Sequence, residues 1–337
     1  MKNKEIVLSG VRPTGQIHFG NYYGAIRNFV KMQEDFDHCF FFIADYHSFT
    51  TQKDASLLPQ QVRRILATYL ACGLDPNKAA IYLQSDIPQI PELYLLLNMI
   101  SYKGELEKVP TFKEKIRQKN QSVNAGLLTY PVLMAADILI HRSNKVPVGK
   151  DQQQHLEMAR DLAGRFNHTF GEDWFPEPQA FNFKQELAKI MSLDGSGAKM
   201  SKSDNNPNNS IFMDDSDKVI EKKIKKATMD AGPTTPNSEK SPGVVGMFGL
   251  MRCVSAPDVV EEYEKQYNDC SIKYGYMKKQ IAEDLIKMVA PIRDRIEDLE
   301  RDTATMKKVI TDGKEQAYES AEKTMEGVRR LTGIQYF

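Results

Sequence analysis

The chain is poor in cysteine and has no long apolar run. Its four cysteines, Cys39, Cys72, Cys253 and Cys270, lie far apart and form no C-x-x-C pair, which argues against a zinc or iron–sulfur site and against a disulfide framework. No apolar run approaches the roughly 20 residues that a membrane-spanning helix needs, and the apolar stretch near the N-terminus is too short for a signal peptide. We therefore expect a reduced, soluble, cytoplasmic protein with no membrane partner.

An excess of either charge is also missing. Lys plus Arg and Asp plus Glu number 45 each, so any nucleic-acid surface must be a local patch rather than a field over the whole molecule. With 41% hydrophobic and 27% charged residues among 337, the composition is that of an ordinary globular protein long enough for two domains.

Short apolar runs alternate with amphipathic stretches through the first half of the chain. This alternation predicts a parallel β-sheet covered by helices on both faces, and such sheets bind ligands beyond the carboxyl ends of their strands. The strands are predicted at residues 5–8, 39–44, 80–83 and 146–148, and the helices at 22–32, 57–71, 92–101 and 152–166.

The second half has a different pattern. No convincing strand follows Ser210, and the amphipathic segments are rich in Glu, Lys and Arg, which predicts an all-helical part. Residues 194–207 and 232–249 are too rich in Gly, Asn and Pro for a helix and predict breaks. The helices are predicted at residues 218–228, 257–267, 274–301 and 314–331.

A glycine-rich turn at residues 9–21 follows the first predicted strand and opens the first helix. Glycines let the backbone approach a ligand closely, and a helix N-terminus presents unpaired N–H groups to a phosphate. His18 and Asn21 are three residues apart at that helix start, so they can face the same anion. A strand-to-helix turn that binds no ligand is the alternative, because glycine-rich loops are weak motifs.

A second motif lies in the polar stretch between the two halves. Lys199 and Lys202 alternate there with Ser201 and Ser203. Two lysines and two hydroxyls in a mobile loop suit the pyrophosphate end of a nucleotide, where they neutralise charge as it moves onto the leaving group. A solvated charged linker is the alternative interpretation.

Together the motifs resemble the signature pair of the class I aminoacyl-tRNA synthetases, an H-x-G-N after the first strand and a K-M-S-K-S before a helical domain. The stretches R-P-T-G-Q-I-H-F-G-N-Y-Y-G-A, L-T-Y-P-V-L-M-A-A-D-I-L and V-P-V-G-K-D-Q-Q-Q-H are similar to bacterial tryptophanyl-tRNA synthetases. The resemblance implies an α/β, Rossmann-like catalytic domain at 1–194 with a dimer-forming insertion, a mobile loop at 195–206, an all-helical anticodon-binding domain at 207–311, and a C-terminal helix at 312–337 that packs back on the catalytic domain.

The resemblance also implies roles for individual residues. The catalytic group would be His18, Lys115, Lys199 and Lys202. ATP would be bound by these lysines of the K-M-S-K-S loop and by Arg12, Pro13, Thr14, Gly20, Asn21, Gly149, Lys150, Asp151, Ile190, Met200, Ser201 and Ser203. Tryptophan would be bound through its ammonium group by Tyr130 and Gln152, through its indole N–H by Asp137, and along its ring by Met134, Val146 and Val148.

Three positions depart from the family pattern. Phe19 replaces a commoner Ile or Leu, which changes packing rather than chemistry. Lys150 replaces a frequent acidic residue, so only its backbone contact carries over. Leu8 stands where some relatives place an aromatic residue against the indole. None of these changes removes a charged catalytic group.

Asp137 is the only charged residue in the apolar run 131–140. A carboxylate there is costly unless it finds a donor. An indole N–H or a phenol O–H fits, and so does a structural donor such as a backbone N–H or Arg142, so the choice of tryptophan over tyrosine rests on the resemblance. His155 is interpreted as a core or capping histidine. His47 is not needed as a base, because the substrate carboxylate is already ionised.

The implied activity has two steps. The tryptophan carboxylate attacks the α-phosphate of ATP, and the tryptophanyl group then passes to the 3′ end of tRNA(Trp). Mg²⁺ would be carried on the phosphates, since no carboxylate cluster for a protein-held metal is apparent. The expected partners are tRNA(Trp), L-tryptophan and a second copy of the chain. A tyrosine-specific sister enzyme and a non-catalytic RNA-binding relative are the alternatives. Four lysines, Lys222, Lys223, Lys225 and Lys226, predict either a tRNA contact or a solvated helix face.

Overall fold

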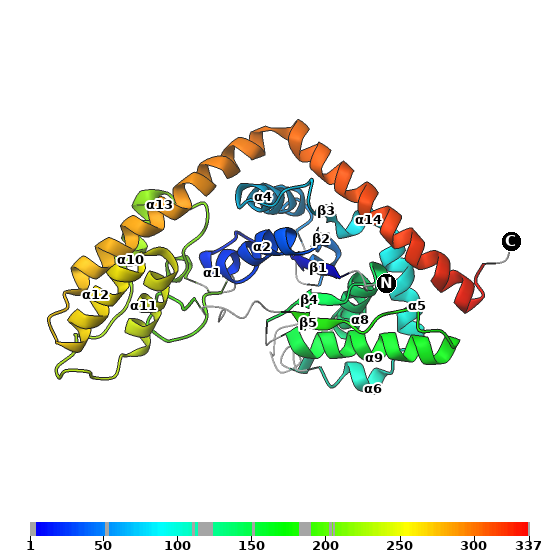
Figure 1. Ribbon diagram of the computed structural model, residues 1–337, viewed down its shortest axis with the longest axis horizontal. Coiled ribbons are helices and arrows are strands. Elements are labelled where there is room, and N and C mark those ends of the chain that lie inside the picture. Colours follow the sequence, from blue (N-terminus) through cyan, green and yellow to red (C-terminus); the bar gives the residue numbers. More distant parts are fainter. Residues whose placement is uncertain are drawn as a thin grey trace.

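The computed structural model describes residues 5–50, 54–109, 112–113, 124–149, 152–181, 190–201, 204 and 206–335. A five-stranded sheet with the strand order β3-β2-β1-β4-β5 forms its centre (Figure 1). All neighbouring strands are parallel, which confirms the predicted Rossmann-like α/β class. The strands are β1 (Ile6–Val11), β2 (His38–Ile43), β3 (Ala80–Leu83), β4 (Lys145–Pro147) and β5 (Gln179–Phe181).

The strand order reverses direction between β1 and β4. The chain runs outward from β1 through β2 to β3, then returns to the other side of β1 for β4 and β5. Connections from β1 and β4 therefore diverge at their carboxyl ends, which is where such sheets usually bind ligands. Residues 12–21 follow β1, and residues 148–149 follow β4, so the fold brings these parts of the predicted site to the same edge of the sheet.

Alternate residues of the strands pack on opposite faces of the sheet. Val7 and Phe41 face a cluster that includes Phe29 and Tyr69, whereas Leu8 and Phe40 belong to a second cluster on the other face. Because both faces are covered, β2 is apolar and buried from Cys39 to Ile43, as strands of parallel sheets usually are. The first face is covered by α2 (Arg27–Asp35) and α4 (Leu58–Ala71), and the second by α5 (Gln89–Met99), α8 (Ala125–Ile140) and α9 (Gln153–Phe170).

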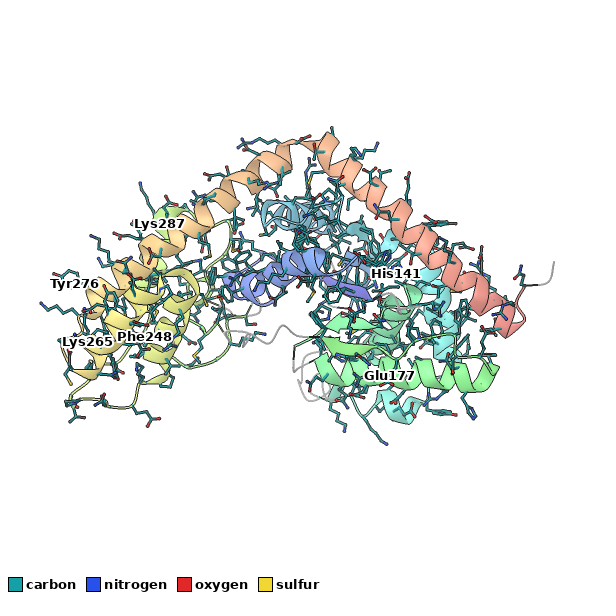
Figure 2. All side chains as sticks on the ribbon, viewed as in Figure 1. His141, Glu177, Phe248, Lys265, Tyr276 and Lys287 are labelled. Carbon is teal, nitrogen blue, oxygen red and sulfur yellow. The ribbon has the colours of Figure 1, made fainter. Side chains whose placement is uncertain are left out.

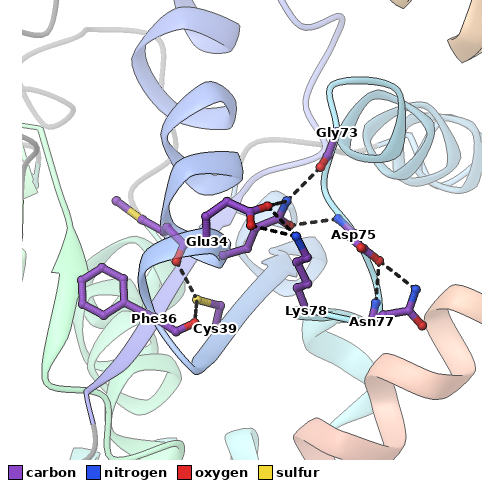
Figure 3. Close-up of polar contacts among 9 residues, drawn as sticks. Glu34, Phe36, Cys39, Gly73, Asp75, Asn77 and Lys78 are labelled. Carbon is purple, nitrogen blue, oxygen red and sulfur yellow. Dashed lines mark hydrogen bonds and ion pairs between the residues drawn. The ribbon is translucent and has the colours of Figure 1, made fainter.

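The connections around β2 and β3 are held by polar contacts (Figure 3). Gln33 donates to the carbonyl of Gly73 at 3.0 Å and accepts the N–H of Asp75 at 2.9 Å, while Lys78 pairs with Glu34 at 2.7 Å. These bonds join the end of α2 to the turn that leads into β3, and they fix where β3 begins.

Cys39 lies at the start of β2, against the end of α2. Its thiol donates to the carbonyls of Met32 and Phe36. Burial raises the pKa of the Cys39 thiol to about 12, so this cysteine is a packed thiol rather than a nucleophile or a metal ligand.

Several short helices lie at the ends of strands. The predicted helix at 22–32 is irregular, because α1 (Phe19–Asn21) is followed by a π-helical turn at Tyr22–Ile26 before α2 begins. Such π-helical turns often occur at functional sites. The other short elements are α3 (Asp45–Ser48), a 3₁₀ turn at Gln84–Asp86, α6 (Lys103–Leu106) and a 3₁₀ turn at Pro207–Asn209.

The second half consists of helices, as predicted, and Figure 1 shows α13 and α14 meeting at an angle above the sheet. Helix α14 begins well before the predicted residue 314. None of the helices that the structure describes is both long and apolar enough to cross a membrane. The helices are α10 (Asp217–Lys226), α11 (Pro242–Val254), α12 (Pro257–Asn268), α13 (Tyr274–Arg301) and α14 (Thr303–Thr332).

The prediction of a break at 232–249 is wrong for its second part, where α11 begins. Ser241 caps this helix by accepting the N–H of Val244, and Pro242 occupies the first turn, which are ordinary helix-start signals. A Cβ on Gly243 would lie 2.4 Å from the carbonyl oxygen of Thr228. Close packing against a neighbouring backbone, rather than an interruption of the helix, therefore explains this glycine.

Helix α14 covers the edge strand β3 (Figure 1), which removes an exposed sheet edge. The contact is close at Gly313, where an added Cβ would lie 2.0 Å from the carbonyl oxygen of Ile81. Ala317 and Ala321 continue the same buried face. Small residues on this face let the helix approach the strand.

Gly313→Ala should destabilise the protein although alanine favours a helix. The added methyl would push α14 off β3, and such overpacking costs about 1–3 kcal/mol. Gly164→Ala in α9 is the matched control, because nothing lies within 4 Å of its added Cβ, and it should gain up to about 1 kcal/mol from helix propensity. Urea unfolding of both variants measures the difference, and equal effects would contradict the packing of α14 on β3.

Candidate nucleotide and amino-acid site

His18 lies at the start of α1, directly beyond β1. Its imidazole is only 2% exposed, and Nδ1 accepts the N–H of Asn21 at 3.1 Å. The ring also explains Gly20, because a Cβ there would lie 3.0 Å from Nδ1. His18 therefore caps the helix, in addition to any role toward a ligand.

The sequence predicted unpaired N–H groups at this helix start, but two of these groups are already hydrogen-bonded within the protein. The Phe19 N–H donates to the carbonyl of Ile211 at 2.7 Å, and the Asn21 N–H is bound by His18. A three-residue helix needs such partners, because its first N–H groups have none within the helix. The Asn21 side-chain Oδ1, by contrast, is buried without a hydrogen-bond partner.

Backbone pairing brings the second predicted motif to the first. The Met213 N–H donates to the carbonyl of Ile17 at 2.9 Å, beside the bond from Phe19 to Ile211. Met200 donates its N–H to the carbonyl of Ile190 at 2.9 Å, and Ile190 in turn lies against Gly20. The two halves of the predicted ATP site are therefore neighbours in space.

The remaining residues of the predicted ATP site have various degrees of exposure. Arg12, Lys199 and Ser201 are exposed, whereas Met200 is buried beneath the loop. Pro13 is buried, and Thr14 and Gly149 are partly buried. Five predicted residues lie outside the described part of the chain: Lys115, Lys150, Asp151, Lys202 and Ser203.

Helix α8 carries the predicted amino-acid site. Tyr130, Met134 and Asp137 have the spacing i, i+4, i+7, which places them on one face of the helix. Val146 and Val148 on and beyond β4 are buried, at 3% and 5% exposure. The structure thus presents a carboxylate and an apolar wall near the carboxyl end of the sheet.

Asp137 is 1% exposed, and both of its carboxylate oxygens have donors. His47 Nε2 lies 2.9 Å from Oδ2, and Gln84 donates to Oδ1 at 2.7 Å. Asp137 therefore has structural donors, as one of the alternatives from the sequence expected, but they are side chains of other elements. Arg142, the side chain suggested for this role, lies over the ring of Trp174 at 4.6 Å instead. Burial raises the pKa of Asp137, and the hydrogen bond from His47 opposes that rise. His47 follows β2, and Gln84 follows β3. Their positions at the ends of neighbouring strands are the sequence signal that could have identified them as partners of Asp137.

A second polar chain runs from α8 to α9. The Tyr130 hydroxyl lies 2.6 Å from His155 Nε2, and His155 Nδ1 lies 2.8 Å from Gln152 Oε1. His155 is 3% exposed, as expected for a core histidine, but it also joins the two residues predicted to hold the ammonium group. The spacing of three residues between Gln152 and His155 had indicated that both could face one cleft, although a core or capping role for His155 was favoured.

Comparison with known proteins identifies the family. A family profile described as "tRNA synthetases class I (W and Y)" matches residues 1–290. This chain belongs to that family. It is 52% identical to a tryptophan–tRNA ligase of Porphyromonas gingivalis over 98% of this chain and 99% of the relative, and 39% identical to that of Clostridium acetobutylicum over 99% and 98%.

A solved structure has the same fold as this synthetase. The tryptophanyl-tRNA synthetase of Campylobacter jejuni, complexed with ADP and tryptophan, is 33% identical and superposes with a TM-score of 0.85, covering 97% of this chain and 99% of that one. The class I synthetase fold expected from the two motifs is therefore confirmed.

The lysines of α10 do not all face solvent in this synthetase. Lys222, Lys225 and Lys226 are exposed. Lys223 is 5% exposed, pairs with Asp215 at 2.7 Å and lies over the ring of Phe212. Both predictions for Lys223, a tRNA contact and a solvated face, are therefore wrong. The turn at 212–217 needs this buried cation to balance its carboxylate.

Asp137→Asn should change how the stability of the synthetase depends on pH. Because the pKa of Asp137 is raised above 3.8, the folded chain holds this proton more tightly than the unfolded chain. The resulting stability is fully present below pH 3.8 and is lost as the pH rises through the folded-state pKa. As the pH rises from 3.8 through the folded-state pKa of Asp137, the free energy of unfolding of the wild type should therefore fall relative to that of the variant. A wild-type advantage that grows with pH would mean that the fold favours the ionised carboxylate.

Proposed function

We infer that this chain is a tryptophan–tRNA ligase, which forms tryptophanyl-adenylate and pyrophosphate from tryptophan and ATP and then charges tRNA(Trp). The 52% identity to a curated tryptophan–tRNA ligase over 98% of the chain carries this inference. The proximity of the two signature motifs supports it, since Met200 of the second motif pairs with Ile190, which lies against Gly20 of the first. Adenylate formation needs the phosphates and the carboxylate in one place.

The proposed ATP site lies between residues 12–21 and 190–203. The buried, unpartnered Asn21 Oδ1 would accept a donor of the nucleotide, and Gly20 would lie beside it in the same turn. Lys199 and Lys202 would balance charge on the departing pyrophosphate. Arg12, Pro13 and Thr14, with Gly149, Lys150 and Asp151, would complete the cradle, and Lys115 would approach from the opposite wall.

Mg²⁺ would arrive on the phosphates of ATP and neutralise part of their charge. Among the described residues there is no group of three His, Cys, Asp or Glu side chains arranged to hold a metal ion. The side chains that this chain would offer to the phosphates are lysines and a histidine, which suit phosphate oxygens rather than a divalent cation.

The proposed amino-acid site uses the polar groups on α8. Asp137 would accept the indole N–H in addition to its bonds from His47 and Gln84, because a carboxylate has about four lone-pair positions. Those two bonds hold the carboxylate in place before the substrate arrives. Tyr130 and Gln152 would bind the ammonium group, with His155 fixing both side chains.

The proposed partners are tRNA(Trp) and a second copy of the chain, in the cytoplasm. The helical part at 207–311 would read the anticodon, and its far end carries Tyr276, which is 66% exposed (Figure 2). A homodimer is supported by exposed apolar residues of α5 and the start of α6: Leu95 is 54%, Met99 73% and Tyr102 63% exposed. The catalytic part would be residues 1–194, joined through the mobile loop 195–206, with 312–337 packing back on it.

Lys202→Ala should lower the rate of ATP–pyrophosphate exchange far more than it weakens tryptophan binding. Removing one donor to a developing negative charge costs on the order of 3 kcal/mol, about a hundredfold in rate. Lys225→Ala, an exposed lysine of α10, is the matched control and should exchange normally. Near-normal exchange by Lys202→Ala would contradict this role and would indicate that the loop is a solvated linker.

Asp137→Asn should narrow the discrimination between tryptophan and phenylalanine. An indole N–H can only donate, so it needs an acceptor, and a hydrogen bond to a charged partner is worth about 1.5–3 kcal/mol. The specificity constant for tryptophan should fall roughly tenfold to a hundredfold, whereas phenylalanine, which makes no such bond, should lose far less. Exchange with both amino acids measures this, and equal losses would mean that Asp137 only supports the site.

A further inference from the structure

The turn at 212–217 joins the K-M-S-K-S side of the site to α10, and several elements hold it. The Phe212 N–H and Lys223 both donate to Asp215 Oδ2, at 2.9 and 2.7 Å. Arg293 of α13 donates to the carbonyl of Asp215 at 3.1 Å. These contacts belong to the helical part of the chain, and they make the turn a rigid extension of it.

The next contact crosses to the nucleotide-binding part. Asp214 Oδ2 accepts from Gln16 at 2.8 Å and from Arg64 at 2.7 Å. Arg64, on α4, donates with its other nitrogen to Glu300 near the end of α13 at 2.5 Å. The side chains of Asp214, Arg64 and Glu300 are 13%, 23% and 28% exposed, so water screens this network less than a surface ion pair.

Gln16 is in the glycine-rich turn of the ATP site. It follows Gly15, whose φ of +67° is a left-handed conformation that glycine adopts without strain. Its side-chain amide is bound by Asp214 from a distant part of the chain. This bond and the backbone bonds of Ile17 and Phe19 to residues 211–213 fasten the turn to the helical part.

We propose that Asp214 and Arg64 are positioning residues for tryptophan activation: they hold the ATP-binding turn in its binding-competent conformation through Gln16, and Glu300 makes that hold depend on the position of α13. The proposal rests on the proposed function. It concerns the state of the free enzyme, because none of the three residues needs to touch the substrates.

A turn that is less often in the competent conformation binds ATP with a correspondingly weaker apparent affinity. Once ATP is bound, the turn is held by the ligand, and the chemical step proceeds as before. Loss of the contact therefore raises the KM for ATP and leaves kcat unchanged. A purely structural role would instead reduce the fraction of folded enzyme, which lowers kcat and leaves KM unchanged.

The test is ATP–pyrophosphate exchange with tryptophan on the full chain, for wild type, Arg64→Met, Asp214→Ala and the double variant. Each single variant should raise the KM for ATP about tenfold, while kcat and the KM for tryptophan change by less than about twofold. The double variant should also raise the KM for ATP about tenfold and not a hundredfold, because both substitutions break the same contact between Arg64 and Asp214.

Arg329→Met is the matched control. Arg329 also pairs with two carboxylates, Glu92 at 2.6 Å and Glu322 at 2.5 Å, and is 27% exposed, but it joins α14 to α5. It should lower the Tm about as much as Arg64→Met does and leave the KM for ATP at the wild-type value.

Two results would overturn the proposal: a fall in kcat with an unchanged KM for ATP in the single variants, or a double variant whose KM is the product of the two single effects. Absence of tryptophan-dependent exchange in wild type would overturn the proposed function itself, and this inference with it.

Discussion

Two backbone hydrogen bonds, from Phe19 to Ile211 and from Met213 to Ile17, join segments that lie far apart in the sequence. The first segment opens the helix beyond β1, and the second leads from the K-M-S-K-S loop into the helical part. Because these bonds join main-chain atoms, the relative position of the two segments does not depend on the identity of their side chains. The proposed ATP site and the contact of Gln16 with Asp214 both depend on this pairing.

The amino-acid site depends on a different constraint, which is the burial of a carboxylate. Asp137 lies in an apolar helix and is 1% exposed, so it needs donors to offset the loss of water. His47 and Gln84 supply these donors from the ends of β2 and β3. These two strands lie on the same side of β1 in the sheet. A polar group oriented in advance in a dry site binds its ligand without rearrangement, which favours selectivity for a substrate that hydrogen-bonds over one that does not.

Sequence patterns predicted the parallel sheet and the helical second half, because strand runs and helix periodicity are local signals. They missed α11, where glycines at Gly243 and Gly246 reflect close packing that only the tertiary structure reveals. They also missed the partners of Asp137, since His47 and Gln84 reach it through the fold of the sheet. Lys223 had the composition of a surface residue, and only the position of Asp215 explains its burial.

The central claim is that this synthetase selects tryptophan, and the most direct measurement is ATP–pyrophosphate exchange by the wild-type chain with each of the twenty amino acids separately. The account predicts rapid exchange with tryptophan and at most a small background with tyrosine and phenylalanine. In the proposed site, Asp137 would accept a hydrogen bond from the indole N–H, and Met134, Val146 and Val148 would line the ring. Exchange driven by tyrosine as well as by tryptophan, or by tyrosine alone, would contradict it.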